Sequence, residues 1–414
     1  MDFRPSEAER VTRRAVREFA EGELAPDVMV RDEAQRFPME LLPKLGALGL
    51  LGIQFPERYG GAGMSALDYC ICIEELARVD PTIALAVAAH NGLCAAHVHR
   101  FGSEAQREHV LGPLARGECL GAWALTEPDA GSDAGAIRTT AVRVAGGWRL
   151  DGAKVFVTHG GVAGFTVVMA VTDPTRGRHG ISAFIVERDA AGMTVGRKEN
   201  KLGMRATETA ELRFDDCRLA DDALLGTEGQ GFVNAMQVLD AGRIGIAAVA
   251  VGLAQGAFDA ARRHAVERRQ FGRPIGAFQA IQWKLANMAT EIEAARLLTY
   301  RAAYLKDRGE RTTRESSMAK LRASETAVRV AEECVQIHGG YGFVKDYPAE
   351  KLYRDVKLLT IGEGTSEIQR LVIARQYLDA PAPESVAGER RGLVSEGSGA
   401  ERSRQATIGG PASR

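Results

Sequence analysis

The 414-residue chain has almost no excess of one charge. Its 53 Lys and Arg side chains nearly cancel 54 Asp and Glu side chains, which leaves a formal net charge of −1. A protein that binds nucleic acid through the phosphate backbone needs a basic surface. We therefore expect no nucleic-acid partner, although arginines recur near the C-terminus, at Arg390, Arg391, Arg402, Arg404 and Arg414.

Cysteine is scarce and scattered through the sequence. The Cys70-x-Cys72 pair has the spacing of neither a zinc site nor a thioredoxin-like redox motif. We expect no metal site, and reduced, buried thiols of the kind found in cytoplasmic proteins. The six cysteines are Cys70, Cys72, Cys94, Cys119, Cys217 and Cys334.

The sequence also lacks a long uninterrupted apolar run. The longest, from Ile244 to Phe258, contains Gln255 and lies between Arg243 and Asp259. It is too short to cross a bilayer, which favours a buried helix. Because the N-terminus is charged and amphipathic, no signal peptide is expected. These features predict no membrane association and a cytoplasmic location.

Residues 1–120 carry helical periodicity. Ser6 and Glu9 have the spacing of a capping box at the start of a helix. A second helix is predicted around residues 40–50, and helical spacing resumes over 66–117. We predict an N-terminal α-helical domain.

From Leu120 onward, short β-rich runs alternate with turns. Gly146-Gly147 is typical of a two-residue hairpin. This texture predicts a β-sandwich or barrel over residues 121–228. Its expected strands include residues 142–144, 148–150, 155–158, 165–172, 181–186 and 210–214.

Helical periodicity returns at Gly231. Long helices with few breaks predict a C-terminal four-helix bundle over residues 229–379. After Leu378 the composition shifts to Ala, Pro, Gly, Ser, Glu and Arg, which predicts a disordered tail over 380–414. The fold class is therefore α+β multidomain, and the expected bundle helices cover residues 232–268, 278–308, 315–338 and 366–378.

Five segments carry motifs. Taken alone, Trp123–Asp133 is a strand that leads into a glycine-containing turn. Its hydroxyl and N–H groups could receive an anionic or heteroaromatic ligand, and a polar surface turn has the same pattern. Together and in this order, the five closely resemble the acyl-CoA dehydrogenase family, especially its short-chain and branched-short-chain members. The segments are Trp123–Asp133, Lys154–Thr158, Glu267–Pro274, Gln336–Gly340 and Ile361–Gln369.

The resemblance, which runs from about Ser6 to Leu378, implies FAD as the cofactor. Trp123–Ser132 matches the part of the family that holds the isoalloxazine ring. Arg268 and Gln279 match residues that reach FAD from a neighbouring subunit, so a homotetramer, a dimer of dimers, is implied. The implied FAD-binding residues are Trp123, Leu125, Thr126, Gly131, Ser132, Phe156, Val157, Thr158, Arg268, Phe271, Gln279, Gln336, Ile337, Gly339, Gly340, Thr365 and Glu367.

Two positions depart from the family pattern. Phe156 stands where many relatives carry Trp, and His159 stands where they carry Asn. Phenylalanine still offers an apolar ring face. We expect His159 to be a partly exposed, non-catalytic histidine.

The resemblance also implies a substrate site formed by Ser132, Asp240, Arg243 and Gly364. Asp240 and Arg243 fall in a segment that the apolar pattern places at the start of a helix. A capped helix start with an exposed ion pair therefore remains an alternative for Asp240. The overall similarity favours short or methyl-branched acyl groups.

Glu363 lies between two glycines, after an apolar run. A carboxylate in a dry pocket can act as a base, because burial disfavours its charged form. A glutamate placed near the start of the helix over 366–378 by the helix dipole is the structural alternative. The resemblance favours the base, since most family members carry the catalytic Glu here. Some branches carry it on the substrate helix, at the position of Gly242, which has no side chain.

The expected reaction is the α,β-dehydrogenation of an acyl-CoA thioester to the trans-2-enoyl-CoA. Glu363 removes the α-proton, and N5 of FAD accepts the β-hydrogen as hydride. An electron-transfer flavoprotein is the expected electron acceptor. The alternatives are an oxidase or monooxygenase on the same fold, and a DNA-associated flavoprotein of the same superfamily.

Overall fold

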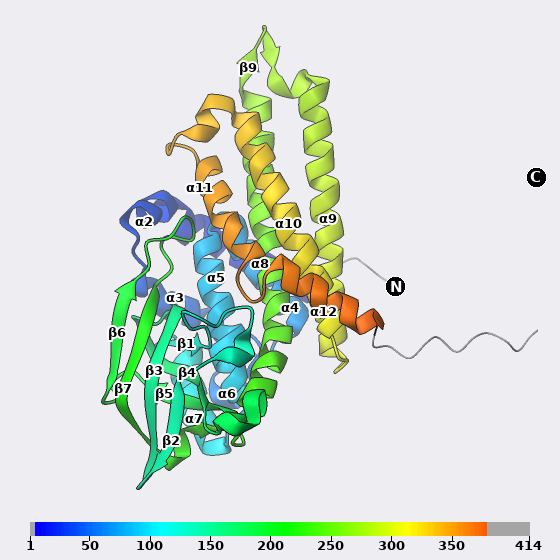
Figure 1. Ribbon diagram of the computed structural model, residues 1–414. Helices are drawn as coiled ribbons and strands as arrows, with labels where there is room; N and C mark the ends of the chain where they lie inside the picture. The colour runs from blue at the N-terminus through cyan, green and yellow to red at the C-terminus, as the bar shows by residue number, and fades with distance from the viewer. Residues whose placement is uncertain (1–4, 379–414) are drawn as a thin grey trace, which may run out of the picture.

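The computed structural model, which describes residues 5–378, has a β-rich region that lies between two helical regions in the sequence and to one side of them in space (Figure 1). The predicted order of helices, strands and helices is therefore confirmed. The predicted tail over residues 380–414 lies outside the described residues.

The N-terminal region is helical throughout. The capping box at Ser6 is confirmed, because its hydroxyl accepts from the Glu9 N–H and the Glu9 side chain accepts from the Ser6 N–H. The helix predicted around 40–50 is shorter than expected, since it stops before Gly49, which has a φ of +71°. The α-helices are α1 (Glu7–Phe19), α2 (Val28–Ala34), α3 (Leu42–Ala47), α4 (Ala66–Val79), α5 (Pro81–Ala89), α6 (Ala96–Phe101) and α7 (Glu104–Ala115).

The middle region is a β-sandwich made of two half-sheets. One half has the strand order β6-β7-β3-β2, and the other contains β4, β5 and β8, with β1 parallel to β4. A single pair, Thr140 with Val171, joins the halves. Side chains from both halves form the core, where the rings of Trp148 and Phe184 meet at 5.1 Å. The strands are β1 (Leu120–Ala124), β2 (Thr140–Val144), β3 (Gly147–Thr158), β4 (Ala163–Val171), β5 (Ile181–Glu187), β6 (Met193–Lys198), β7 (Thr209–Ala220) and β8 (Leu224–Leu225).

Two details of the strand prediction are wrong. The hairpin turn is Ala145-Gly146, because Gly147 pairs with Val144 inside the ladder. Residues 148–150 and 155–158 belong to one strand, β3, which a register shift between Lys154 and Val157 interrupts.

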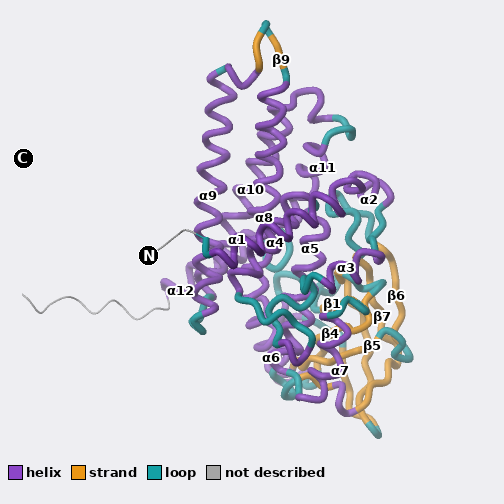
Figure 2. The backbone as a smooth tube through the Cα atoms, turned by 180° about the vertical axis from the view of Figure 1, so that it is seen from behind, coloured by secondary structure: helices purple, strands orange, loops and turns teal. Residues whose placement is uncertain are grey.

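The C-terminal region is the predicted helical bundle. Figure 2 shows α8, α9 and α10 side by side, with the β9 hairpin at their far end. The short helix α12 packs against α10. The elements are α8 (Gly231–Glu267), β9 (Arg269–Gln270), β10 (Arg273–Pro274), α9 (Gln279–Asp307), α10 (Thr313–His338), α11 (Pro348–Asp355) and α12 (Ser366–Leu378).

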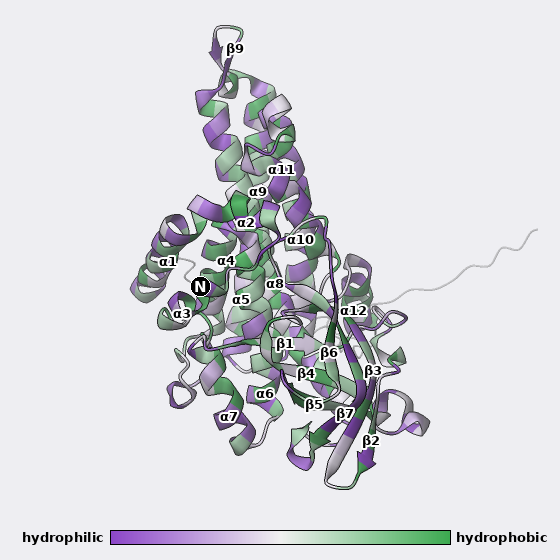
Figure 3. Cartoon of the chain, turned by 90° about the vertical axis from the view of Figure 1, so that its left-hand side faces the viewer, coloured by the Kyte–Doolittle hydropathy of each residue, from purple (hydrophilic) through white to green (hydrophobic). Residues whose placement is uncertain are grey.

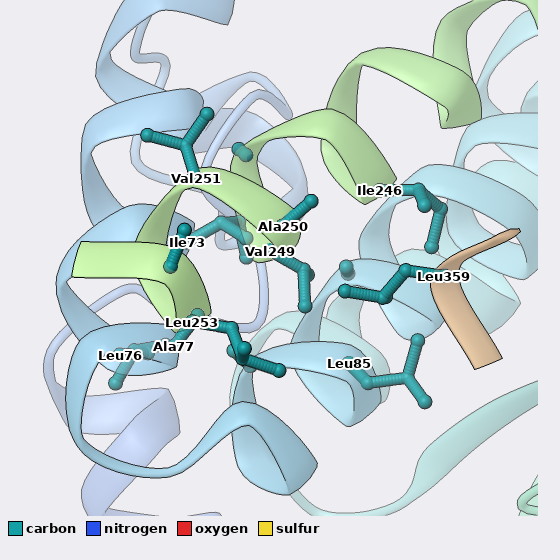
Figure 4. Close-up of a cluster of buried hydrophobic side chains, with 14 of the residues drawn as sticks. Ile73, Leu76, Ala77, Leu85, Ile246, Val249, Ala250, Val251, Leu253 and Leu359 are labelled. Carbon is teal, nitrogen blue, oxygen red and sulfur yellow. The ribbon is translucent and has the colours of Figure 1, made fainter. Parts of the chain in front are cut away.

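Helix α8 is the central element of the molecule. Residues 244–254 are buried throughout, and α8 packs mainly against α10 and α4. Figure 4 shows side chains of this stretch beside Ile73 of α4 and Leu85 of α5. The backbones of α4 and α8 approach each other so closely that a Cβ added at Gly252 would lie 2.2 Å from the Glu74 carbonyl oxygen. Of the described helices, only α8 is long and apolar enough to cross a bilayer, yet 72% of its apolar window is buried in the protein. The predicted buried helix is confirmed.

A buried polar network ties the three regions together. Lys351 of α11 pairs with Asp355 at 2.5 Å, and its ammonium group lies 3.7 Å from Asp80 at the start of α5. Asp355 also accepts the N–H of Met204, which follows β6. Hydrophilic residues dominate the exposed tip at β9, whereas α4 at the centre is largely hydrophobic (Figure 3). All six cysteines are free thiols, five buried and Cys119 half-buried.

Candidate active site

The loop between α11 and α12 presents the Glu363 side chain to α8. The Glu363 backbone has a φ of +53°, and the next residue, Gly364, has a φ of +93°. One carboxylate oxygen, Oε2, is buried and has no hydrogen-bond partner among residues 5–378. A Cβ added at Gly242 would lie 2.3 Å from this oxygen. The two positions at which the family carries its base therefore meet at one point in space.

Glu363 does not cap the helix that follows it. Helix α12 begins at Ser366, and the hydroxyl of Thr365 accepts the Ile368 N–H at 3.3 Å. The Glu363 carboxylate points toward α8 rather than toward the free N–H groups of α12. The geometry thus disfavours the helix-dipole interpretation of this residue.

Burial dominates the electrostatics of Glu363. It raises the pKa of the carboxyl group to about 7, against the opposing influence of Lys320 and Arg243. The group therefore loses its proton near neutral pH, which suits a general base.

Asp240 and Arg243 form an ion pair with an N···O distance of 2.5 Å. The expectation that this segment opens the helix is wrong, because α8 begins nine residues before Asp240. The alternative of an exposed pair is also wrong, since only 5% of Arg243 is exposed. Thr313 of α10 donates to the second carboxylate oxygen of Asp240 at 2.6 Å. The pair lies beside the Glu363 loop, since Glu363 influences the pKa of Arg243.

A small apolar cluster separates Glu363 from the predicted flavin segment. Leu93 belongs to this cluster and would lie 3.3 Å from a Cβ at Gly242. Trp123 packs against the same cluster from the β1 side. One turn further along α8, a Cβ at Gly245 would lie 2.5 Å from the Tyr69 hydroxyl oxygen. Leu93, Gly242 and, one turn further along α8, Tyr69 thus line the region beside Glu363, which we call the apolar space, with Tyr69 at its inner end.

The predicted ring-binding residues lie together where β1 and β3 end. The N–H of Val155 donates to the carbonyl of Thr126 at 2.9 Å, which joins the two segments. Phe156 has a φ of +56° and turns its ring outward, with 65% of the residue exposed. Ser132 is exposed and Thr126 and Thr158 are half-buried, so a ligand can reach these three hydroxyl-bearing residues.

The other residues of these segments have distinct surroundings. Leu125 and Val157 are buried beneath the segments, with 7% and 1% of their surfaces exposed. Gly131 is open, because no heavy atom lies within 4 Å of a Cβ placed there. These segments therefore present an accessible edge of polar groups above a buried layer of apolar side chains.

An interior ion pair that sequence reasoning missed holds this edge in place. Lys154 is fully buried and donates to the Leu125 carbonyl at 3.1 Å and to the Glu127 carboxylate at 2.7 Å. Glu127 also accepts the N–H groups of Arg138 and Thr139. Both charged residues lie inside matched segments, but lysine and glutamate are rarely buried, so the pattern alone suggests solvent exposure.

The expectation that His159 is partly exposed is wrong. The residue is fully buried, and burial lowers its pKa to about 4. Its Nδ1 lies 3.0 Å from the Gly121 carbonyl oxygen, while the Gly121 N–H donates to His90 Nδ1 at 3.1 Å. Two neutral imidazoles thus satisfy the strand backbone at Gly121, next to the Trp123 segment.

The remaining predicted FAD residues, apart from Thr365 and Glu367, form a second group at the far end of the bundle. The guanidinium group of Arg268 lies 5.1 Å from the ring centroid of Tyr341, and the rings of His264 and His338 stack at 4.4 Å. These contacts bring Arg268 next to the segment that contains Gln336, Ile337, Gly339 and Gly340. Phe271 contacts Phe278, the residue before Gln279.

The two groups are far apart within one chain. Gly242 and Arg268 are separated by 26 positions of α8, which corresponds to about 40 Å. Three predicted residues lie near Glu363 instead, namely Gly364, Thr365 and Glu367. Glu367 is exposed and Thr365 is half-buried. One chain therefore does not bring all predicted cofactor residues together.

Comparisons with known proteins agree with the three-part architecture. The family described as "Acyl-CoA dehydrogenase" matches with its N-terminal domain over residues 6–118, its middle domain over 122–217 and its C-terminal domain over 229–378. The short-chain specific acyl-CoA dehydrogenase of Clostridium acetobutylicum is 48% identical over 374 residues, which cover 90% of this chain and 99% of that protein.

Two solved structures are also similar. Butyryl-CoA dehydrogenase from Megasphaera elsdenii superimposes with a TM-score of 0.90 at 43% identity, over 91% of this chain and 100% of that chain. A chain in a structure of the electron transferring flavoprotein of Acidaminococcus fermentans gives a TM-score of 0.91 at 46% identity, over 92% and 100% of the two chains. The chain therefore belongs to the acyl-CoA dehydrogenase family.

Proposed function

We propose that the protein oxidises a short-chain acyl-CoA thioester to the trans-2-enoyl-CoA, with FAD as cofactor and an electron-transfer flavoprotein as electron acceptor. The observation that carries the proposal is Oε2 of the Glu363 carboxylate, which is buried, lacks a hydrogen-bond partner in the described chain and lies against Gly242, next to the apolar side chain of Leu93. The similarity to acyl-CoA and butyryl-CoA dehydrogenases supports the substrate class. The similarity to a chain in an electron transferring flavoprotein structure supports the acceptor.

Glu363 acts as the base that removes the α-proton of the thioester. Its raised pKa, about 7, gives it the proton affinity that the step needs, and the apolar surroundings keep water away. The unpartnered Oε2 is free to approach a substrate carbon. Arg243, held by Asp240, supplies a nearby positive charge.

The described residues fit a bound flavin. The accessible hydroxyls of Thr126, Ser132 and Thr158 suit the polar edge of the ring system, and the exposed Phe156 offers an aromatic face. Trp123 and Gly131 complete that surface, and the buried Leu125 and Val157 support it from beneath. Bound FAD supplies the hydride acceptor. Lys154 and Glu127 position this surface, because both bond to the backbone or side chains of the segment.

The second group receives the dinucleotide part of a neighbouring subunit's cofactor. Arginine suits a pyrophosphate, and no heavy atom lies within 4 Å of a Cβ at Gly339 or Gly340, so a ligand can approach the backbone. The separation of about 40 Å along α8 supports a site shared between subunits. A homotetramer built as a dimer of dimers meets this requirement, and the cytoplasm is the expected location.

The inner end of the apolar space favours a short acyl chain. Gly242 and Gly245 are three positions apart on α8, so Cβ atoms built at these positions would lie about 5–6 Å from each other. Glu363 faces the first and the Tyr69 hydroxyl faces the second. A chain whose α-carbon lies at Glu363 therefore meets Tyr69 after about three to four bonds of ~1.5 Å. Ser132 and Gly364 complete the proposed substrate contacts.

The test is anaerobic bleaching of the purified flavoprotein by butyryl-CoA. We expect the Glu363→Gln holoenzyme to bind butyryl-CoA and to bleach about 10³-fold more slowly than the unmodified protein, because it lacks the base. Glu325→Gln is the matched control, since Glu325 pairs with Arg370 on the surface of the bundle. Bleaching at the normal rate by Glu363→Gln would overturn the assignment of the base. Rapid peroxide formation in air would instead support an oxidase.

A further inference from the structure

Lys320 is a buried cation that the proposed reaction does not yet use. It lies on α10, and none of its surface is exposed. Burying an ammonium group is unfavourable unless it gains compensating contacts. Among residues 5–378, no carboxylate forms an ion pair with it, and its Nζ donates to the Gly364 carbonyl at 2.7 Å. The fold thus places a positive charge directly on the loop that carries Glu363.

The same carbonyl is held from a second side. The fully buried Gln369 donates to the Gly364 carbonyl at 2.9 Å and to the Glu363 carbonyl at 3.3 Å. Glu363 has a left-handed backbone, a conformation that is unfavourable for a residue with a side chain. Lys320 and Gln369 together hold this strained loop, and the backbone conformation aims the carboxylate at Gly242.

The charged and titratable groups around Glu363 differ in how far they are neutralised. Arg243 of α8 also influences the pKa of Glu363, but Asp240 neutralises it at 2.5 Å. Tyr69 of α4 is neutral, because burial and Glu363 raise its pKa well above its usual value. Glu367 of α12 and Glu325 of α10 influence Lys320 without an ion pair to it. Lys320 is therefore the cation near Glu363 that lacks a carboxylate partner in the described structure.

We propose that Lys320 is a positioning residue for the base. Its ammonium group holds the Gly364 carbonyl, and its unpaired charge keeps the Glu363 carboxylate ionised in a buried site. The inference rests on the proposed function, because it presupposes that Glu363 is the base.

The titration of both groups agrees with this geometry. Burial lowers the pKa of Lys320 to about 8, and burial raises the pKa of Glu363 to about 7. Between these values both groups are charged. Among the groups that oppose the rise in the pKa of Glu363, Lys320 has the largest influence. Loss of its charge should therefore move the pKa of Glu363 further upward.

The experiment compares Lys320→Gln and Lys320→Met by their pH profiles. The holoenzymes are mixed with butyryl-CoA without oxygen, and the rate of flavin bleaching is followed from acid to alkaline pH. Lys320→Gln keeps a hydrogen-bond donor but loses the charge, so its acid limb should move up by about one pH unit, which is about tenfold slower bleaching below pH 7. Lys320→Met loses both, and should show the same displacement together with a lower plateau at high pH.

Two further variants complete the design. Lys320→Arg keeps the charge and should retain the acid limb of the unmodified protein. Lys306→Met is the matched control, because Lys306 also has its pKa lowered by burial but donates to Gln54, away from Glu363. The acid limb of the Lys306→Met pH profile should stay at the pH of the unmodified protein.

Several results would overturn the inference. An unchanged acid limb in Lys320→Gln would do so, and so would a Lys320→Arg protein that shares the displaced limb of Lys320→Gln. If Lys320→Met does not fold, the Gln and Arg variants still decide the outcome. Normal bleaching by Glu363→Gln would instead refute the proposed base, which separates the two failures.

Discussion

The two ends of α8 differ in how completely one chain forms them. At the Glu363 end, Oε2 of the carboxylate, Arg243 and Lys320 are buried, and contacts within the chain fix Arg243 on Asp240 and Lys320 on the Gly364 carbonyl. At the β9 end, 92% of Phe271 and 86% of Phe343 are exposed. Large apolar side chains on a surface mark an interaction site. The surroundings of the proposed base are thus arranged within one chain, whereas the β9 end exposes the apolar surface at which we propose that a second chain binds.

The Gly242→Ala substitution should have the largest effect at the enclosed end. The added methyl group would lie 2.3 Å from Glu363 Oε2, so the carboxylate has to move. A displacement of about 1 Å in a reacting group can lower the rate by about 10²-fold. Anaerobic bleaching by butyryl-CoA measures this loss. Gly22→Ala, where no heavy atom lies within 4 Å of the new methyl group, is the control and should bleach normally.

The open end should respond through cofactor binding rather than through the base. Loss of a charged hydrogen bond in Arg268→Ala should weaken FAD retention by about tenfold or more. The FAD content of dialysed protein measures it, with the exposed Arg269→Ala as the control.

Subunit mixing tests the difference between the two ends directly. When Glu363→Gln and Arg268→Ala chains are co-expressed, mixed oligomers contain one site with both original residues. We expect bleaching to recover above the level of either variant alone. If each chain supplied both residues to its own site, mixing would restore nothing.

The pH dependence should report the enclosed end alone. With a pKa of about 7, Glu363 is protonated in acid, so the bleaching rate should fall about tenfold for each pH unit below 7. FAD content should stay constant over the same range. A rate that is flat down to pH 5 would show that another group removes the proton.

The smallest expected effect concerns chain length. Tyr69→Ala opens the inner end of the apolar space, and each additional buried methylene contributes about 0.8 kcal/mol, which is about fourfold in rate. The ratio of hexanoyl-CoA to butyryl-CoA bleaching should rise by that order for each methylene accommodated. Tyr59→Ala, which removes a buried tyrosine whose hydroxyl donates to Glu104 rather than facing Gly245, should leave the ratio unchanged.

Much of the architecture could be predicted from sequence patterns. Helical periodicity and the turn residues indicated the three regions, because both follow from local geometry. Glu363 could be identified only through the resemblance, since a carboxylate between glycines is also compatible with a helix start. Its approach to Gly242 joins segments about 120 positions apart, and no local pattern encodes such a contact.

The wrong expectation for His159 and the two buried lysines that the sequence did not reveal share a physical cause. His159, Lys154 and Lys320 are polar residue types, so the sequence favours exposure, yet the fold buries all three and gives each a specific partner. The predicted helix over 232–268 agrees with α8 to within one residue at each end, and only the placement of Asp240 at a helix start was wrong, because the apolar pattern begins where burial begins, whereas the helix extends into half-exposed residues before it. Burial depends on the packing of distant segments, which the sequence pattern does not show.

The contact between Gly242 and Glu363 also constrains how relatives of this protein can diverge. The point that one carboxylate oxygen occupies is the point where a side chain on α8 would begin, so the two sites exclude each other sterically. A lineage that gains an acidic residue at position 242 must first replace the glutamate at position 363 by a shorter residue. A lineage that gains a glutamate at position 363 must likewise have a residue without a long side chain at position 242. The two positions should therefore covary as a pair with a single acidic member. Neither position by itself identifies an active member of this fold.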